Sequence, residues 1–337
     1  MAVSANAVIL PEPGRVEFRT VEIPDPGPDE VEIRTVFSGI SPGTERWVFL
    51  GRYNHMSDDV PAFYPCSPGY QAAGVVERVG AEVTSLRPGD AVLTDGTRFC
   101  DAGIKQRGPT KGPHVSRHVA KATQVTKLPP GTDLASAALF RLASVSRHGV
   151  RLTQVRAGEL VVIIGQGMIG QMSGQAARRL GARVISSDLV PARVELSARY
   201  SADRAVDASR EDLASIVREE APGGADVVID TTGNSQIFPV CRDLIRNEGR
   251  IALQGYYPDP ICVDFHPAHL KHPTVTFPCG WDTEDDEALA SDIGTGRVTI
   301  APLITHRFEA RYAADAYRLI VDHPEESLGV VLSWDGA

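Results

Sequence analysis

Residues 160–170 read LVVIIGQGMIG, an apolar run followed at once by a glycine-rich turn. The run, Leu160 to Ile164, is long enough for a strand that is buried on both faces of a parallel sheet. The turn has the spacing G-x-G-x-x-G, and apolar residues at helical spacing follow it. A strand, this turn and a helix in that order predict that a dinucleotide binds at the start of the helix.

The three glycines of the turn have separate expected roles. Gly165 permits a tight bend, Gly167 lets backbone N–H groups approach a pyrophosphate, and Gly170 lets the helix pack closely on the strand. The whole turn is therefore expected to contact the cofactor, namely Gly165, Gln166, Gly167, Met168, Ile169 and Gly170.

A second short strand, residues 182–187, ends at Asp188. A carboxylate at such a strand end, roughly twenty residues past the glycines, accepts hydrogen bonds from the adenosine ribose and repels a 2′-phosphate. Arg193, five residues further on, either reaches the adenosine side or is solvated. These residues predict NAD, rather than NADP, as the cofactor.

Composition points to a soluble enzyme of two domains. A chain of 337 residues is long for a single core. The net charge of −9 argues against a nucleic-acid partner. No apolar stretch approaches the length of a membrane span, and the N-terminus lacks the features of a signal peptide. Five cysteines without a CxxC pair fit reduced thiols. We expect a cytoplasmic protein with a small-molecule substrate.

The chain divides into a β-rich part, an alternating part and a tail. Up to about residue 140, alternating segments such as residues 31–36 predict half-buried antiparallel strands, followed by a helix over 134–150. Six strands then alternate with helices, at residues 160–164, 183–187, 206–207, 227–230, 251–253 and 274–277. The tail is predicted to contain helices over 282–294 and 310–321 and a strand over 329–333, and to return to the first domain. The expected fold class is α/β, a Rossmann doubly wound parallel sheet with a mainly β domain.

Motifs of the β-rich part resemble a known family. PGYQAAGVV at 68–76, followed by RPGDAV at 87–92, is similar to the first-domain signature of the medium-chain dehydrogenase/reductase family. The order of β-rich domain, GQGMIG, Asp188 and returning tail extends the likeness over essentially the whole chain. The resemblance implies a GroES-like catalytic domain at 1–141 and 278–337, and a Rossmann dinucleotide-binding domain at 142–277. It also implies hydride transfer to or from a nicotinamide, and a homodimer formed through an apolar sheet edge at 251–257 and 275–277.

The zinc ligands typical of that family are missing. Its usual ligands are a Cys after Gly-Ile, a His in Pro-Gly-His-Glu and a Cys or acid ahead of the cofactor domain; this chain has SGISPGTERW at 38–47, Tyr70 and Leu142 there. The structural zinc loop is also absent, and the HxxHxxH string at 266–272 is expected to be a solvated loop. The pattern resembles a zinc-free branch of bacteriochlorophyllide a dehydrogenase-like proteins. We therefore expect no metal.

Four residues are candidates for the chemistry. By resemblance, Tyr70 stands where the histidine ligand would be, and its phenol is expected to donate to or accept from the reacting oxygen; its alternative role is to line the pocket. Thr44 and Glu45 match a proton-relaying hydroxyl and its neighbouring acid, or form a turn held by side-chain hydrogen bonds. His148, on the predicted helix, suits proton transfer near neutral pH or is a packed or surface residue.

Further residues are expected to contact the cofactor. Ser146 matches a family hydroxyl that touches the nicotinamide. Thr231 lies at the end of the fourth strand, and Gly255 and Tyr256 lie at the end of the fifth, where such sheets bind ligands. Arginines that can meet an anionic group of the substrate, or are simply solvated, are Arg98, Arg141 and Arg147.

The leading hypothesis is a metal-independent, NAD-dependent oxidoreductase acting between a secondary alcohol and a ketone. The substrate class is a polyhydroxylated compound, such as a sugar or cyclitol, or a secondary metabolite. A zinc-free quinone or enone reductase is the alternative, since an enolate oxygen needs only hydrogen-bond donors. A protein that binds NAD(H) without catalysis is a third possibility.

Overall fold

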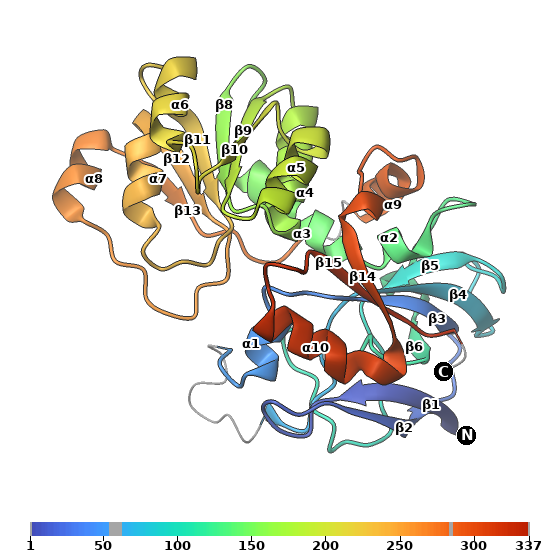
Figure 1. Cartoon of the computed structure of the whole chain (residues 1–337). Coiled ribbons are helices and arrows are strands. Elements are labelled where there is room, and N and C mark those ends of the chain that lie inside the picture. Colours follow the sequence, from blue (N-terminus) through green and yellow to red (C-terminus); the bar gives the residue numbers. More distant parts are fainter. Residues whose placement is uncertain (1, 54–62, 283–285, 336–337) are drawn as a thin grey trace. The chain divides into compact units, whose positions relative to one another are not determined.

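The computed structural model describes residues 2–53, 63–282 and 286–335 (Figure 1). The chain forms two compact units. Unit 1 comprises residues 1–141 and 284–337, and unit 2 comprises residues 142–283. Unit 2 therefore ends a few residues later than the boundary at 277 that the strand pattern suggests. Within the described residues, no helix has the length and apolar content needed to cross a membrane.

Unit 2 contains a six-stranded parallel sheet in the order β10-β9-β8-β11-β12-β13. Its strands are β8 (Leu160–Ile164), β9 (Arg183–Asp188), β10 (Arg204–Asp207), β11 (Ala225–Asp230), β12 (Ile245–Leu253) and β13 (Thr274–Thr276). Counted along the chain this order is 3-2-1-4-5-6, the doubly wound arrangement of dinucleotide-binding domains. The predicted Rossmann sheet is confirmed, with each strand near its expected place.

Both faces of this sheet are covered. Its helices are α3 (Phe140–Leu152), α4 (Met168–Arg179), α5 (Pro191–Tyr200), α6 (Leu213–Glu220), α7 (Phe238–Leu244) and α8 (Phe265–Lys271). Alternate residues of β8 enter separate cores: Val162 packs with residues of α6 and α7, whereas Val161 packs with residues of α3 and α4. A strand buried on both faces explains why 160–164 is apolar throughout.

Unit 1 is built on a seven-stranded sheet and a separate hairpin (Figure 1). The strands of the sheet are β3 (Glu30–Ile40), β4 (Ala72–Val79), β5 (Ala91–Thr94), β6 (Arg117–Lys121), β7 (Thr126–Lys127), β14 (Ile304–Glu309) and β15 (Gly329–Ser333). The hairpin pairs β1 (Ala2–Ile9) with β2 (Glu17–Pro24). The helices of this unit include α1 (Glu45–Phe49), α2 (Leu134–Ala137) and α9 (Asp286–Gly294).

The tail joins the sheet of the N-terminal part. Strand β15 pairs antiparallel with β3, with Val331 opposite Gly39, and β14, which the sequence pattern did not indicate, pairs with β15. Between them, α10 (Ala313–Asp322) packs its apolar face into a core that also contains residues of α1. The tail therefore lies against the end of β3 and the segment that follows it.

Residues 31–36 of β3 have the expected half-buried pattern, because Val31, Ile33 and Thr35 are buried whereas Arg34 on the opposite face is exposed. On that outer face Glu32 is covered by Arg78 and Arg117. Two other local predictions are wrong for identifiable reasons. The helix expected over 134–150 is two helices, because the N–H of Arg141 donates to Oε1 of Gln71 (3.1 Å) rather than to the preceding turn. Residues 266–271 form most of helix α8 instead of a loop.

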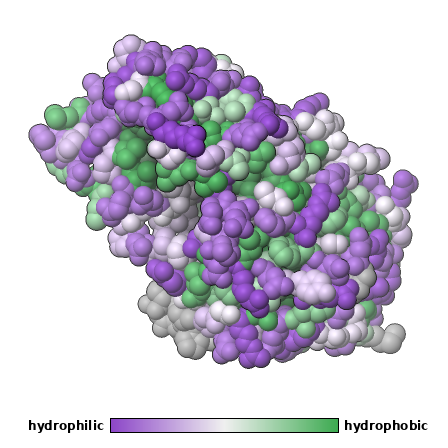
Figure 2. Space-filling view, viewed as in Figure 1, coloured by the Kyte–Doolittle hydropathy of each residue, from purple (hydrophilic) through white to green (hydrophobic). Residues whose placement is uncertain are grey.

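The sheet edge also differs from expectation. Strand β12 pairs with β11 on one side and β13 on the other, so residues 251–253 are internal and β13 alone forms that edge. The surface is largely hydrophilic in the view of Figure 2. Large apolar side chains that are exposed in this part of unit 2 are Val263, Phe265, Leu270 and Phe277.

Candidate active site

Two hydroxyl groups meet at the positions where the family resemblance places zinc ligands. Ser41 follows β3 and Tyr70 precedes β4, and because these strands are antiparallel with Ser38 opposite Ala72, the two flanking segments lie together. The phenol of Tyr70 donates to Oγ of Ser41 at 2.7 Å. Tyr70 is 7% exposed and Ser41 is 2% exposed. The pair is therefore a largely desolvated hydrogen bond between neutral side chains.

The carboxylate of Glu45 lies beneath this pair and is completely buried. Its Oε1 accepts the backbone N–H of Ser41 (2.8 Å), and its Oε2 accepts the phenol of Tyr317 (2.5 Å) and contacts Nε2 of His114 (3.0 Å). All three partners lie outside helix α1, which begins with Glu45. Glu45 thus holds the backbone of Ser41, and no contact joins it to the hydroxyl of Ser41.

His114 is a central residue that the sequence pattern did not reveal. It is fully buried, just before β6, and its Nδ1 lies 2.7 Å from Oγ of Ser38. Trp334 Nε1 donates to that same hydroxyl (2.9 Å), and Nε2 of His114 lies 3.0 Å from Oε2 of Glu45. A network of hydrogen bonds therefore runs from Trp334 through Ser38 and His114 to Glu45.

The absence of a side chain at Gly69 makes room for the imidazole of His114. Gly69 has φ of +85°, and a Cβ atom there would lie 2.6 Å from Nε2 of His114. Only glycine tolerates both conditions. His114 thereby packs directly against the residue that precedes Tyr70.

Thr44, the remaining candidate of unit 1, and Gln71, the neighbour of Tyr70, differ in the hydrogen bonds of their side chains. Thr44 is the residue preceding α1 and makes no side-chain capping bond there. Gln71 is fully buried, where it accepts from the N–H of Arg141 (3.1 Å) and donates to the carbonyl of Gly39 (3.3 Å). Gln71 therefore organises the chain around Tyr70.

The donor set at Ser41 and Tyr70 does not fit zinc. Zinc in proteins binds thiolate, imidazole or carboxylate groups, whereas these two positions offer a hydroxyl and a phenol that are already hydrogen-bonded to each other. Leu142, at the third position, offers no ligand atom. The nearby carboxylate and imidazole, Glu45 and His114, use their atoms on each other and on protein donors.

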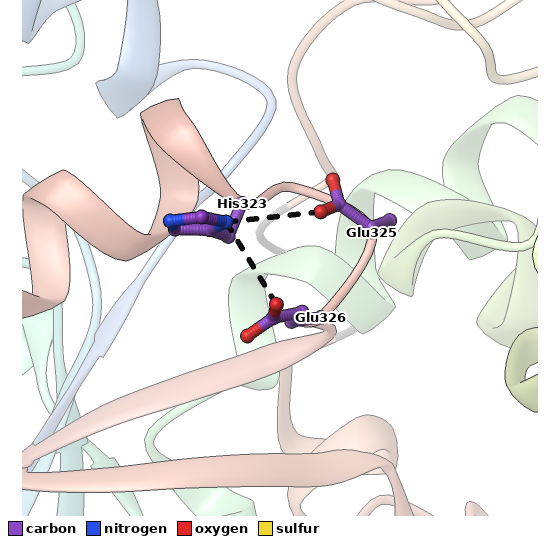
Figure 3. Close-up of side chains that lie close together, drawn as sticks. All are labelled: His323, Glu325 and Glu326. Atoms are coloured by element: carbon purple, nitrogen blue, oxygen red, sulfur yellow. Dashed lines mark ion pairs between the residues drawn. The ribbon is translucent and has the colours of Figure 1, made fainter.

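Among the described residues, one group of side chains lies close enough to hold a metal ion: His323, Glu325 and Glu326. Figure 3 shows both carboxylates near the imidazole, 3.9 and 3.7 Å from its Nδ1. All three side chains are exposed after α10. Solvated clusters of this kind are common without an ion, and we assign no role to it.

In unit 2, the glycine turn has the geometry that a pyrophosphate requires. Gly165 has φ of +87°, and a Cβ at Gly170 would lie 1.9 Å from the carbonyl oxygen of Gly165. Around Gly167, which precedes α4, no heavy atom lies within 4 Å of the place where a Cβ would be. Thr231 donates to the carbonyl of Gly165 at 2.9 Å and so secures the bend. The N-terminus of α4 is therefore open to an anion.

Asp188 lies beside this turn at the end of β9. Its side chain is 8% exposed and accepts the N–H groups of Gln166 (2.5 Å) and Val190 (2.8 Å). Arg193 places a guanidinium nitrogen 4.0 Å from it. Gln166 is itself buried and donates to the carbonyl of Gly165. Met168 is buried and Ile169 is partly buried at the start of α4.

The other residues expected at the cofactor, and His148, which is the remaining candidate for the chemistry, have local partners. Ser146, fully buried, donates to the carbonyl oxygens of Leu142 (2.8 Å) and Ile169 (3.1 Å). His148 is partly buried on α3, where its Nδ1 lies 3.3 Å from the guanidinium of Arg151. Gly255 and Tyr256 are partly buried after β12, and the N–H of Gly255 donates to the carbonyl of Asp230.

Arg98 and Arg141, which the sequence offers for substrate binding, are paired within the protein. Arg98 lies 2.6 Å from Glu30, and buried Arg141 binds both carboxylate oxygens of Asp286 at 2.7 Å and also pairs with Asp95. These contacts satisfy their charges internally. Arg147 is partly buried on α3.

Comparison with known proteins agrees with this architecture. The family described as "Alcohol dehydrogenase GroES-like domain" matches residues 27–130, and that described as "Zinc-binding dehydrogenase" matches residues 169–291. L-threonine 3-dehydrogenase of Anaeromyxobacter dehalogenans is 31% identical over 86% of this chain and 87% of its own length. The 2-desacetyl-2-hydroxyethyl bacteriochlorophyllide A dehydrogenase of Cereibacter sphaeroides is 29% identical over 98% of each chain.

Solved structures show the same fold. A protein from Sinorhizobium meliloti 1021 that is described as a zinc-binding dehydrogenase, solved bound to NADP, has a TM-score of 0.82 and 24% identity, covering 98% of this chain and 99% of that one. An alcohol dehydrogenase from Escherichia coli CFT073, solved with NADH, has a TM-score of 0.83 and 21% identity over the same shares. The two units thus define an oxidoreductase of the alcohol dehydrogenase type. The chain belongs to the medium-chain dehydrogenase/reductase family.

A second buried histidine near the site makes a prediction about pH. Burial, reinforced by His114, lowers the pKa of His118 from 6.5 to about 3. The unfolded chain therefore binds a proton that the folded chain excludes, and stability is lost as pH falls from 6.5 toward 3. In His118→Asn, whose amide can still reach the hydroxyl of Thr35, the unfolding free energy should fall less steeply, by up to about 1.4 kcal/mol per pH unit. Urea unfolding across this range measures the slope; an unchanged slope would contradict a buried neutral imidazole.

Proposed function

We propose that this protein is an NAD-dependent oxidoreductase that interconverts a secondary alcohol and a ketone without a catalytic zinc ion. The observation that carries the proposal is the hydrogen bond between Tyr70 and Ser41, which occupies the family's metal-ligand positions. Hydroxyl donors can stabilise a developing oxyanion, and they do not require a cation to do so.

The energetic demand on these residues is large. A zinc ion lowers the pKa of bound water steeply, to about 7, and this lowering corresponds to roughly 12 kcal/mol. A positioned acid or base contributes about 10²–10⁴-fold in rate. A single acid or base supplies less than the zinc ion would. The rate of the proposed reaction therefore depends on how accurately the hydroxyls of Tyr70 and Ser41 are placed.

Within this site Tyr70 is the proposed proton donor and acceptor. A nicotinamide cofactor, when bound, supplies the hydride in reduction and accepts it in oxidation. During reduction the phenol of Tyr70 gives its proton to the ketone oxygen, and Ser41 turns its own O–H toward the phenolate. Solvent then returns a proton to Tyr70. In alcohol oxidation the same groups act in reverse order.

NAD is the proposed cofactor because Asp188 presents a carboxylate beside the glycine turn. A 2′-phosphate would lie close to this charge, which Arg193 only partly balances at 4.0 Å. The cofactor contacts proposed for unit 2 include the glycine turn, Ser146, Thr231 and the segment at 255–256. We further propose a cytoplasmic homodimer that forms through the sheet edge at β13, where the side chain of Phe277 is exposed.

The first test is a substrate panel. Purified protein is assayed with NAD and polyols or other secondary alcohols, and with NADH and enones, each with and without a chelator. We expect NAD reduction with at least one secondary alcohol, unaffected by the chelator. Turnover of enones alone would favour the reductase alternative, and NADH binding without any turnover would favour a non-catalytic protein.

The second test replaces Tyr70 by Phe. Losing the phenol should lower kcat by about 10²-fold or more, because the reacting oxygen loses its proton donor. The dissociation constant for NADH, measured by fluorescence, should stay unchanged, since the cofactor contacts lie in unit 2. Unaltered turnover in Tyr70→Phe would remove this residue from the chemistry.

The third test concerns cofactor choice. Asp188→Gly removes the carboxylate that disfavours a 2′-phosphate, so the ratio of kcat/KM for NAD over NADP should fall by about tenfold or more. The variant Asp203→Gly, which removes an exposed acid elsewhere in unit 2, serves as the control. Equal preference in wild type and Asp188→Gly would contradict the role of Asp188.

A further inference from the structure

We propose that Tyr317, on the C-terminal helix α10, is a positioning residue for the Tyr70–Ser41 pair and acts through the carboxylate of Glu45. The inference rests on the proposed function for its kinetic test. Its structural basis is independent of any substrate. No part of Tyr317 is solvent-exposed, so it can act only through its neighbours.

Hydrogen bonds link Tyr317 to Tyr70 through two intervening residues, Glu45 and Ser41. Tyr317 donates its phenol to Oε2 of Glu45 (2.5 Å), and Oε1 of the same carboxylate accepts the N–H of Ser41 (2.8 Å). Oγ of Ser41 then accepts the phenol of Tyr70 (2.7 Å). Three short hydrogen bonds therefore connect Tyr317 on helix α10 to the proposed catalytic hydroxyl of Tyr70, which lies 247 residues earlier in the chain.

The direction of the first bond is fixed. Burial, and then the charge of Glu45, raise the pKa of Tyr317 far above its ordinary value, so its proton stays on the phenol oxygen. A buried carboxylate requires all of its donors, because an unsatisfied charged oxygen away from water is strongly unfavourable. If Tyr317 loses its O–H, Glu45 retains His114 on Oε2 and must reorient, and the bond that holds Ser41 lengthens.

The same core contains a matched control. Tyr64 is 7% exposed, belongs to the same apolar cluster as Tyr317, and donates its phenol to the backbone carbonyl of Val48. No contact joins Tyr64 to Glu45 within the described residues. Tyr64→Phe and Tyr317→Phe therefore remove the same group from the same core, and only the second removes a donor to the carboxylate.

The kinetic experiment is a double-mutant cycle of wild type, Tyr317→Phe, Tyr70→Phe and the double variant, with Tyr64→Phe beside it. We expect Tyr317→Phe to lower kcat by about tenfold, as loss of a hydrogen bond to a charged group predicts, with the affinity for NADH unchanged. In the Tyr70→Phe background the second substitution should have no further effect, because the group being positioned is gone. Additive effects, or an equal loss of kcat in Tyr64→Phe, would overturn the proposal.

A spectroscopic measurement separates this proposal from the proposed function. Protein labelled with ¹³C at Cζ of its eight tyrosines gives a Tyr70 resonance that is identified by its loss in Tyr70→Phe. That resonance should shift in Tyr317→Phe and stay in place in Tyr64→Phe. Should the wild type turn over no alcohol, the proposed function fails, and the resonance still decides the positioning role. An unshifted Tyr70 signal in Tyr317→Phe would refute it.

Discussion

The burial of one carboxylate, that of Glu45, constrains the folding of the whole of unit 1. A carboxylate with no exposure to water is tolerated only when its oxygens are well supplied with donors. These donors come from three separate places: the turn after β3, the segment before β6 and the helix α10. Unit 1 can therefore assemble this centre only when its N-terminal and C-terminal parts have both folded onto the sheet.

The proposed chemistry follows from what that centre holds. Its hydrogen bonds end at a backbone N–H of Ser41, and the hydroxyl of Ser41 meets the phenol of Tyr70. A metal ion would orient a substrate oxygen by direct coordination; a hydroxyl pair must be oriented by its surroundings. In this account the rigid, buried network does the positioning, and the glycine turn and Asp188 of unit 2 serve the cofactor.

The sequence predicted the strands and the glycine turn better than it predicted the hydrogen-bond partners of individual side chains. The central strands of unit 2 were predictable because a strand covered on both faces must be apolar. The glycine turn was predictable because each of its three glycines meets a separate backbone requirement of the strand-to-helix connection. His114 carried no such signal: its partners, Ser38 and Glu45, lie about 70 residues away and meet it only through the pairing of β3 and β6. His148 was chosen for its residue type, whereas in the structure its Nδ1 lies beside Arg151. The break at Ala138 was hidden because Gln71, far earlier in the chain, takes the N–H of Arg141.

The central claim is that side chains, without a cation, stabilise the reacting oxygen, and the zinc content of active protein tests it most directly. A single preparation is assayed for turnover of a secondary alcohol and for bound metals by mass spectrometry. We predict full activity with far less than one zinc ion per chain, and no gain when zinc is added. One zinc ion per chain, with activity that is lost and regained as the zinc is removed and restored, would contradict it.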